Sequence, residues 1–176
     1  MISVENSLGH GSLIFTRNPY LLPLFGDRKP IPYLPRSQFT KVRAQLSPDG
    51  RWMAYTSDES GRNEVYAQTF PNPSGRWQIS ATGGASPRWR RDAKELFYIA
   101  SDGKLMAVPV RGTGTAIEIS EPTPLYEILT RAGVTGVGNV RYDVAGDGER
   151  FLVVSVEDRD TTPLSVVLNW TNGLKK

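Results

Sequence analysis

The chain has 176 residues, of which 39% are hydrophobic and 22% charged, a balance that predicts a folded protein with a sizeable core. It has no cysteine and one histidine, His10, which excludes disulfide scaffolds, thiol nucleophiles and zinc sites built on cysteines or several histidines. The net charge of +3 is too small to indicate a nucleic-acid partner, and no stretch approaches the roughly 20 apolar residues of a membrane span.

The first part of the chain predicts two edge strands. Residues 1–16 are expected to form an N-terminal leader with one candidate strand at Ser12–Thr16. Strands at Tyr20–Phe25 and Ile31–Leu34 follow, joined by a turn at Gly26–Lys29. Proline cannot donate to a strand ladder, so the four prolines at 23, 30, 32 and 35 place these strands at a sheet edge.

Three later segments resemble one another: Ser47–Tyr55, Arg90–Tyr98 and Ala145–Val153. Each has an aspartate in a turn, then polar residues, then an apolar run. The aspartates are 43 and 55 residues apart. Strand-rich units repeating at about 40–50 residues indicate the blades of a β-propeller.

The repeated turns contain the residues that we assign a structural role. These are Asp49, Gly50, Asp92, Asp147 and Gly148. Aspartate accepts hydrogen bonds from backbone N–H groups two residues on, and glycine provides positive φ. A ring of acids around a metal is the alternative interpretation. Ala93 replaces glycine in the middle copy, so we expect that turn to differ.

Strand pairs follow each turn. They are Trp52–Ser57 with Glu64–Phe70, Glu95–Ala100 with Leu105–Val110, and Arg150–Val156 with Leu164–Trp170. Fourth strands are expected at Arg76–Ser80 and at Thr123–Leu129, the latter after a flexible connection through Gly112–Gly114. A short helix at Leu125–Arg131 is the alternative for the latter.

These elements predict an all-β fold of antiparallel four-stranded propeller blades, incomplete at about three to four blades. The expected organisation of residues 17–176 is a blade part at 17–40, whole blades at 41–82 and 85–130, and a blade lacking its last strand at 138–172.

Several stretches together resemble the WD40-like PD40 repeat of TolB-type β-propellers. They are Leu46–Trp52, Tyr55–Tyr66, Trp77–Ser80, Gly83–Gly84, Pro87–Asp92 and Val167–Trp170. Over roughly residues 20–176 the sequence is most similar to the C-terminal propeller of bacterial, acidobacterial-type serine/threonine protein kinases.

The resemblance implies blades around a channel and a non-enzymatic role in binding a protein or peptide. It implies a sensor or scaffold part of a larger kinase-like or Tol-like protein, outside the cytoplasm or in the periplasm. The first residues lack the pattern of a signal peptide, so that location rests on the resemblance alone. Two alternatives stay open: a propeller accessory of a prolyl-oligopeptidase-type serine peptidase, and a carbohydrate-active propeller.

The length predicts an unfinished ring. At a 43-residue period, six blades need about 258 residues. The N-terminal strands close onto the last blade, or two copies join with twofold symmetry, or the arc stays open. We expect a homo-oligomer formed through the open blade edges, because unpaired strand edges are templates for association.

The candidate binding residues are Trp89, Arg90 and Arg91, because interleaved arginine and tryptophan can stack and pair with charged ligands. The alternative is a strand end with solvated arginines. The four tryptophans, Trp52, Trp77, Trp89 and Trp170, all fall on predicted strands. Core packing between blades is their first interpretation, and a stacking surface the second.

We predict no catalytic residue, metal site or cofactor. His10 is the only imidazole and lies in the leader, and no Gly-x-Ser-x-Gly elbow is present. Glu157, Asp158 and Asp160 cluster in one predicted loop, where a solvated acidic tip is the ordinary interpretation and a calcium site the alternative.

Overall fold

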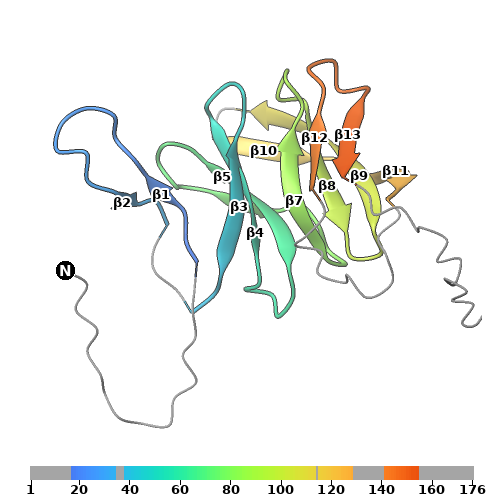
Figure 1. The fold of residues 1–176 in the computed structure, drawn as a ribbon, viewed down its shortest axis with the longest axis horizontal. Helices are drawn as coiled ribbons and strands as arrows, with labels where there is room; N and C mark the ends of the chain where they lie inside the picture. Colours follow the sequence, from blue (N-terminus) through green and yellow to red (C-terminus); the bar gives the residue numbers. More distant parts are fainter. Residues whose placement is uncertain (1–16, 35–37, 114, 129–140, 155–176) are drawn as a thin grey trace, which may run out of the picture.

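The computed structural model describes residues 17–34, 38–113, 115–128 and 141–154, and in these ranges it has thirteen strands (Figure 1). The prediction of an all-β fold is confirmed: the described residues form no helix, and each strand pair among them is antiparallel. This part of the chain also has no helix with the length and apolarity needed to cross a membrane. The leader, with Ser12–Thr16, and the predicted strand Leu164–Trp170 lie outside the described residues.

The first blade is a four-stranded meander. Its strands are β3 (Lys41–Leu46), β4 (Trp52–Ser57), β5 (Glu64–Thr69) and β6 (Arg76–Gln78), hydrogen-bonded in that order. β4 and β5 are buried along their whole length because neighbouring elements cover both faces. β4 has the predicted bounds, and β5 ends one residue before the predicted Phe70.

The second blade is β7 (Gly84–Trp89), β8 (Glu95–Ala100) and β9 (Lys104–Thr113), followed by two short strands. β10 (Ala116–Ile119) pairs with the end of β9, and β11 (Thr123–Glu127) pairs with its beginning.

One expectation for this blade was wrong. Residues 112–113 belong to β9 and not to a flexible connection, because their backbone pairs with β10, and the Trp52 indole packs against Gly112. The predicted strand at Thr123–Leu129 is confirmed over Thr123–Glu127, where the backbone pairs with β9. The alternative of a helix at Leu125–Arg131 does not hold for residues 125–127, which are extended.

Two further sheets have two strands each. At one side of the molecule β1 (Tyr20–Leu21) pairs with β2 (Ile31–Pro32), both shorter than predicted. At the other side β12 (Arg141–Val144) pairs with β13 (Phe151–Val154) (Figure 1). We call β1–β2 the N-terminal hairpin and β12–β13 the third sheet.

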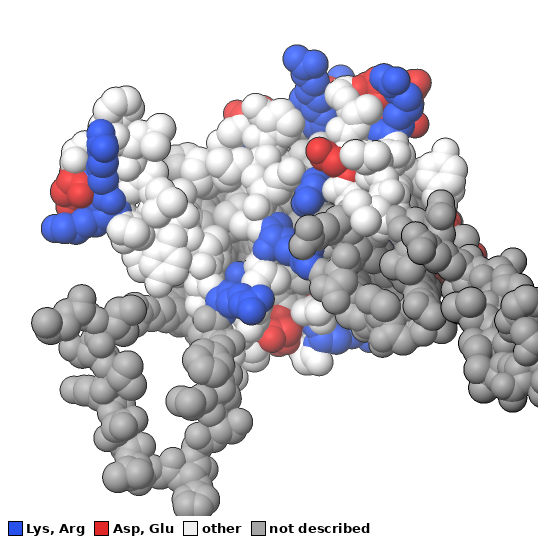
Figure 2. Space-filling model, viewed as in Figure 1, with Lys and Arg blue, Asp and Glu red and all other residues white. Residues whose placement is uncertain are grey.

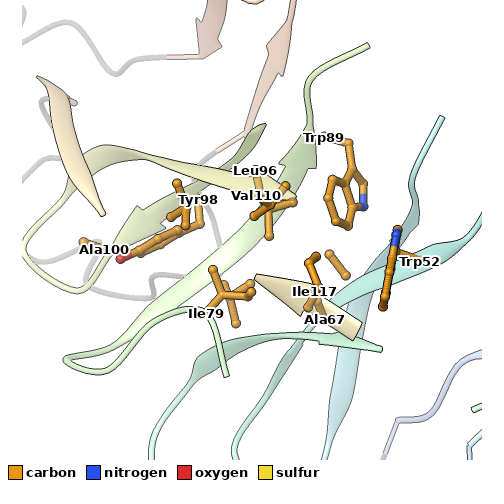
Figure 3. Close-up of a cluster of buried hydrophobic side chains, with 12 residues drawn as sticks. Trp52, Ala67, Ile79, Trp89, Leu96, Tyr98, Ala100, Val110 and Ile117 are labelled. Atoms are coloured by element: carbon orange, nitrogen blue, oxygen red, sulfur yellow. The ribbon is translucent and has the colours of Figure 1, made fainter. Parts of the chain in front are cut away.

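Each sheet packs against the next through an apolar cluster. The cluster between the first and second blades contains Trp52 and Trp89, with Trp77 against it, and Figure 3 shows that Trp52 and Trp89 enter it from different sheets. A second cluster joins the second blade to the third sheet, and a third joins the N-terminal hairpin to the first blade. Along β8 the side chains alternate, so Leu96 and Tyr98 face the first blade and Phe97 and Ile99 face the third sheet.

This arrangement is consistent with an incomplete β-propeller. Successive antiparallel sheets pack face to face, and their first strands, β3, β7 and β12, follow one another side by side (Figure 1).

The three repeated turns are built alike. The N–H groups of Ser47, Arg90 and Ala145 donate to the carbonyls of Trp52, Glu95 and Arg150, at 2.8, 2.9 and 2.8 Å. The carboxylates of Asp49, Asp92 and Asp147 each accept the backbone N–H two residues on, at 3.2, 3.1 and 3.0 Å. Gly50, Ala93 and Gly148 have φ of 68°, 58° and 75°. The expectation that Ala93 changes the middle turn was therefore wrong, because alanine adopts the left-handed conformation there.

Candidate functional site

A repeated irregularity shapes the inner strands. The ladder between β3 and β4 shifts between Val42 and Gln45, and the ladder between β7 and β8 shifts between Ala85 and Arg88. In each case a residue with positive φ lies in the shift, Arg43 at 57° and Ser86 at 59°. A β-bulge of this kind bends the strand and redirects the side chains beside it.

The bulges border a hollow of about 430 Å³ on the inner strands. It is lined by Arg43, Ala44 and Gln45 of β3, Arg88 of β7, and Tyr142 and Asp143 of β12. Figure 2 shows basic side chains gathered over β3 and β7 on this face. Guanidinium groups, an amide and a carboxylate in one hollow can hydrogen-bond a peptide backbone and pair with charged side chains. We call this the inner-strand hollow.

Tyr142 forms its floor. The ring is buried, and its hydroxyl donates to the carbonyl of Ser86 at 2.9 Å, which ties the third sheet to the bulge of β7. Burial raises the pKa of Tyr142, so the phenol keeps its proton and remains a donor at neutral pH. The Arg88 guanidinium lies 5.6 Å from the centre of this ring and donates to the carbonyl of Pro87 at 2.9 Å. Arg88 is thereby held at the hollow.

Gln45 is held just as firmly. Its side-chain oxygen accepts the backbone N–H of Trp89 at 3.0 Å, and its carbonyl accepts the Trp89 indole N–H at 3.3 Å. These two bonds join β3 to β7 and fix the wall of the hollow without a contribution from a ligand.

The structure does not bring the three predicted binding residues together on one surface. Trp89 is buried in the core between the blades. Arg90 pairs with Glu95 at 3.3 Å and with Asp92 at 3.7 Å. Arg91 is exposed and passes close to Gly146 of the third turn. A binding role for the two arginines stays a prediction, and the indole face is not open to a ligand.

None of the residues that line the hollow was among the predicted binding residues. Arg43 and Ser86 are separated by the same 43 residues as the turn aspartates, so the repeat does align the two bulges. Nothing in residue type marks them, because an arginine and a serine rarely adopt positive φ.

The turn aspartates lie elsewhere. Asp49 and Asp92 line a second hollow, of about 440 Å³, beside Arg51 and Lys94. Among the described residues no group of three or more histidines and acids is placed to hold a metal ion. His10 and the acids Glu157, Asp158 and Asp160 lie outside the described residues.

Two comparisons with known proteins find nothing similar: no protein-family model matches the sequence, and no curated protein matches it.

Proposed function

We propose that this chain is a non-enzymatic β-propeller module that binds a protein or peptide through the inner-strand hollow. The observation that carries the proposal is the hollow itself, in which three successive sheets contribute polar side chains held from below by Tyr142 and from the side by the Gln45–Trp89 hydrogen bonds. A preorganised polar hollow binds without a large entropic cost of ordering its walls.

The chemistry of the hollow favours an acidic peptide. Two guanidinium groups, on Arg43 and Arg88, lie there with one carboxylate, on Asp143. Guanidinium forms paired hydrogen bonds with carboxylates, whether of a glutamate side chain or of a chain terminus.

The resemblance to TolB-type propellers supports a wider proposal. By analogy, the chain is the extracytoplasmic sensor or scaffold part of a larger kinase-like or Tol-like protein.

Fluorescence anisotropy tests the binding proposal. The probe is a fluorescein-labelled peptide with three glutamates and a free C-terminal carboxylate. We expect saturable binding that weakens with added salt, and about tenfold weaker binding in Arg88→Ala, because a charge-assisted pair contributes about 1.5–3 kcal/mol. The matched control is Arg111→Ala, since Arg111 is exposed on β9 and does not line the hollow.

Two results would contradict the proposal. One is the absence of binding, or binding that Arg88→Ala leaves unchanged. The other is hydrolysis of peptide or glycoside substrates by the isolated chain that Asp143→Asn abolishes, which would make the hollow a catalytic centre.

A further inference from the structure

The three repeated turns align the blades residue by residue, and the alignment exposes an uncovered face. Trp52, Glu95 and Arg150 are equivalent because their carbonyls accept the same turn hydrogen bond. Two and four residues further on, the first blade has Ala54 and Thr56 and the second has Phe97 and Ile99, all buried. The third sheet has Leu152 and Val154 at these positions, and they are 73% and 66% exposed. In the first two blades this is the face that the following sheet covers.

The first blade, on the other side of the molecule, likewise has an apolar residue that no sheet covers. Leu46 precedes the first turn as Trp89 precedes the second. Trp89 is 7% exposed because the first blade covers it, whereas Leu46 is 46% exposed. A sheet that contributed inner strands in front of the first blade would cover Leu46.

The N-terminal hairpin is the outer half of such a sheet. The N–H of Tyr33 donates to the carbonyl of Pro19, just as the N–H of Ile79 donates to the carbonyl of Val65 in the first blade. The pairing of Leu21 with Ile31 accordingly matches the pairing of Ala67 with Trp77. β1 and β2 thus have the positions of β5 and β6, one blade earlier. Their inner partners are missing from the described residues.

The third sheet is the complementary inner half, and a groove lies where its outer strands belong. The groove measures about 670 Å³ and is mainly apolar. Leu105, Tyr126 and Ile128 of the second blade line it with Phe151 and Val153 of β13. Glu127 and Glu149 also line it, with Arg150.

The hairpin presents a surface that suits this groove. Tyr20 and Leu22 are exposed on the side away from the first blade, because Leu21 between them packs toward that blade. The hairpin turn has two bases, Arg28 and Lys29, and one acid, Asp27, so its net charge is positive. The groove has two acids and one base, so its net charge is negative and attracts the turn.

We propose that two copies of this chain join head to tail, and that the N-terminal hairpin of one copy completes the third sheet of the other as a four-stranded blade. Each copy then contributes two blades of its own and half of two shared blades, so two copies make a ring of six. Rings of four to eight blades are the usual propellers. Closure within one chain would leave only three blades, and the hairpin and the third sheet lie on opposite sides of the molecule (Figure 1).

The register of the shared blade follows from the first blade, where Ala54 pairs with Ala67 and Tyr55 with Tyr66. By equivalence Leu152 pairs with Leu21 of the other copy, and Val153 with Tyr20. The faces agree. Leu21 and Leu152 both turn toward the first blade of the copy that supplies the hairpin, and Tyr20 and Val153 both turn toward the groove.

Sedimentation equilibrium tests the assembly. We expect the full chain to show twice its mass of 19.5 kDa. Leu152→Asp places a charge in the shared blade and should weaken the dimer by about a hundredfold, without unfolding the monomer, in which Leu152 is exposed. The matched control Leu125→Asp alters an exposed leucine of β11 that does not line the groove, and should leave the dimer intact.

Engineered cysteines test the register, and the chain has none of its own. A Tyr20→Cys chain mixed with a differently tagged Val153→Cys chain should form a disulfide-linked heterodimer on oxidation. Mixing Tyr20→Cys with Leu152→Cys should not, because these side chains lie on opposite faces of the sheet.

A monomer at all concentrations would overturn the proposal and leave the groove to the chain's own predicted strand at Leu164–Trp170. A dimer that Leu152→Asp leaves unchanged, or equal crosslinking of both cysteine pairs, would also overturn it by placing the interface elsewhere. Open polymers larger than two chains would overturn the closed ring.

Discussion

Single residues in the repeated turns show how backbone geometry outweighs residue type. The turn at Ala93 has the same hydrogen bonds as the turns at Gly50 and Gly148, although alanine is strained there by about 1–2 kcal/mol. The turn hydrogen bonds and the pairing of β7 with β8 hold a conformation that alanine disfavours.

Ala93→Gly should relieve this strain. Glycine costs about 0.4–1 kcal/mol because of its extra freedom in the unfolded chain, so we expect the free energy of unfolding to rise by up to about 1.6 kcal/mol. Urea unfolding measures it. The control is Gly50→Ala, where an added Cβ meets nothing within 4 Å, so that only backbone strain is introduced and stability should fall. If Ala93→Gly lowered the free energy of unfolding, the claim that Ala93 is strained would be wrong.

The stability that Asp147 gives to the third turn depends on pH. The backbone N–H of Glu149 and the side chain of Arg150 lower the pKa of Asp147 below its usual 3.8. A lowered pKa means that the contribution to stability is present above pH 3.8 and is lost as the pH falls through the folded value. Carboxyl NMR titration should place the midpoint below 3.8, and Arg150→Ala should raise it only in part, since the backbone donor remains. A midpoint at or above 3.8 would contradict the turn geometry.

At the scale of elements, the hairpins of the first two blades were predictable and the first strands were less so. Apolar runs bounded by turn residues identified β4, β5 and β8 correctly. β3 and β7 contain bulges, which interrupt the alternation of side chains that identifies a strand. The division of β9 between two partners depends on contacts with β10 and β11 that no local pattern encodes.

The passage from β5 to β7 depends on one buried carboxylate. Glu64 accepts hydrogen bonds from the Ser80 hydroxyl, from the Gly83 N–H at 2.9 Å and from the Arg62 Nε at 2.7 Å. It therefore fixes the crossing from the first blade to the second.

Glu64→Gln should destabilise the fold by about 1–3 kcal/mol, because an amide cannot accept bonds from all three donors and leaves a buried group unpaired. Thermal and urea unfolding measure the loss. Asp102→Asn, which removes an exposed pair with Lys104, is the control and should change stability by less than about 1 kcal/mol. Equal effects of the two substitutions would contradict the role of Glu64.

At the scale of the whole molecule, the proposed second copy would cover both the exposed face of the third sheet and the exposed Leu46. A dimer stabilises the folded state by mass action, so its thermal midpoint should rise with protein concentration. We expect this rise in the parent chain and not in Leu152→Asp. A midpoint that is independent of concentration in the parent would contradict the dimer.

The inner-strand hollow also belongs to this scale. Its lining comes from three sheets that are distant in sequence, and its main charges lie at bulges and not at conspicuous motifs. The predicted binding residues Trp89, Arg90 and Arg91 directly follow Arg88, yet the alternation of the strand turns Trp89 inward and leaves Arg88 at the hollow.

By itself the sequence determined the all-β class, the repeat and the turn chemistry, because these depend on local spacing and on the backbone preferences of aspartate, glycine and proline. Only the tertiary structure decided which side chains meet. Bulges redirect Arg43 and Arg88, packing between blades buries Trp89, and equivalence between sheets places the N-terminal hairpin at the outer-strand positions and the third sheet at the inner-strand positions of a blade. The reason is physical: contacts between sheets depend on strand twist, register and face, and these are set by partners that lie tens of residues away in the chain.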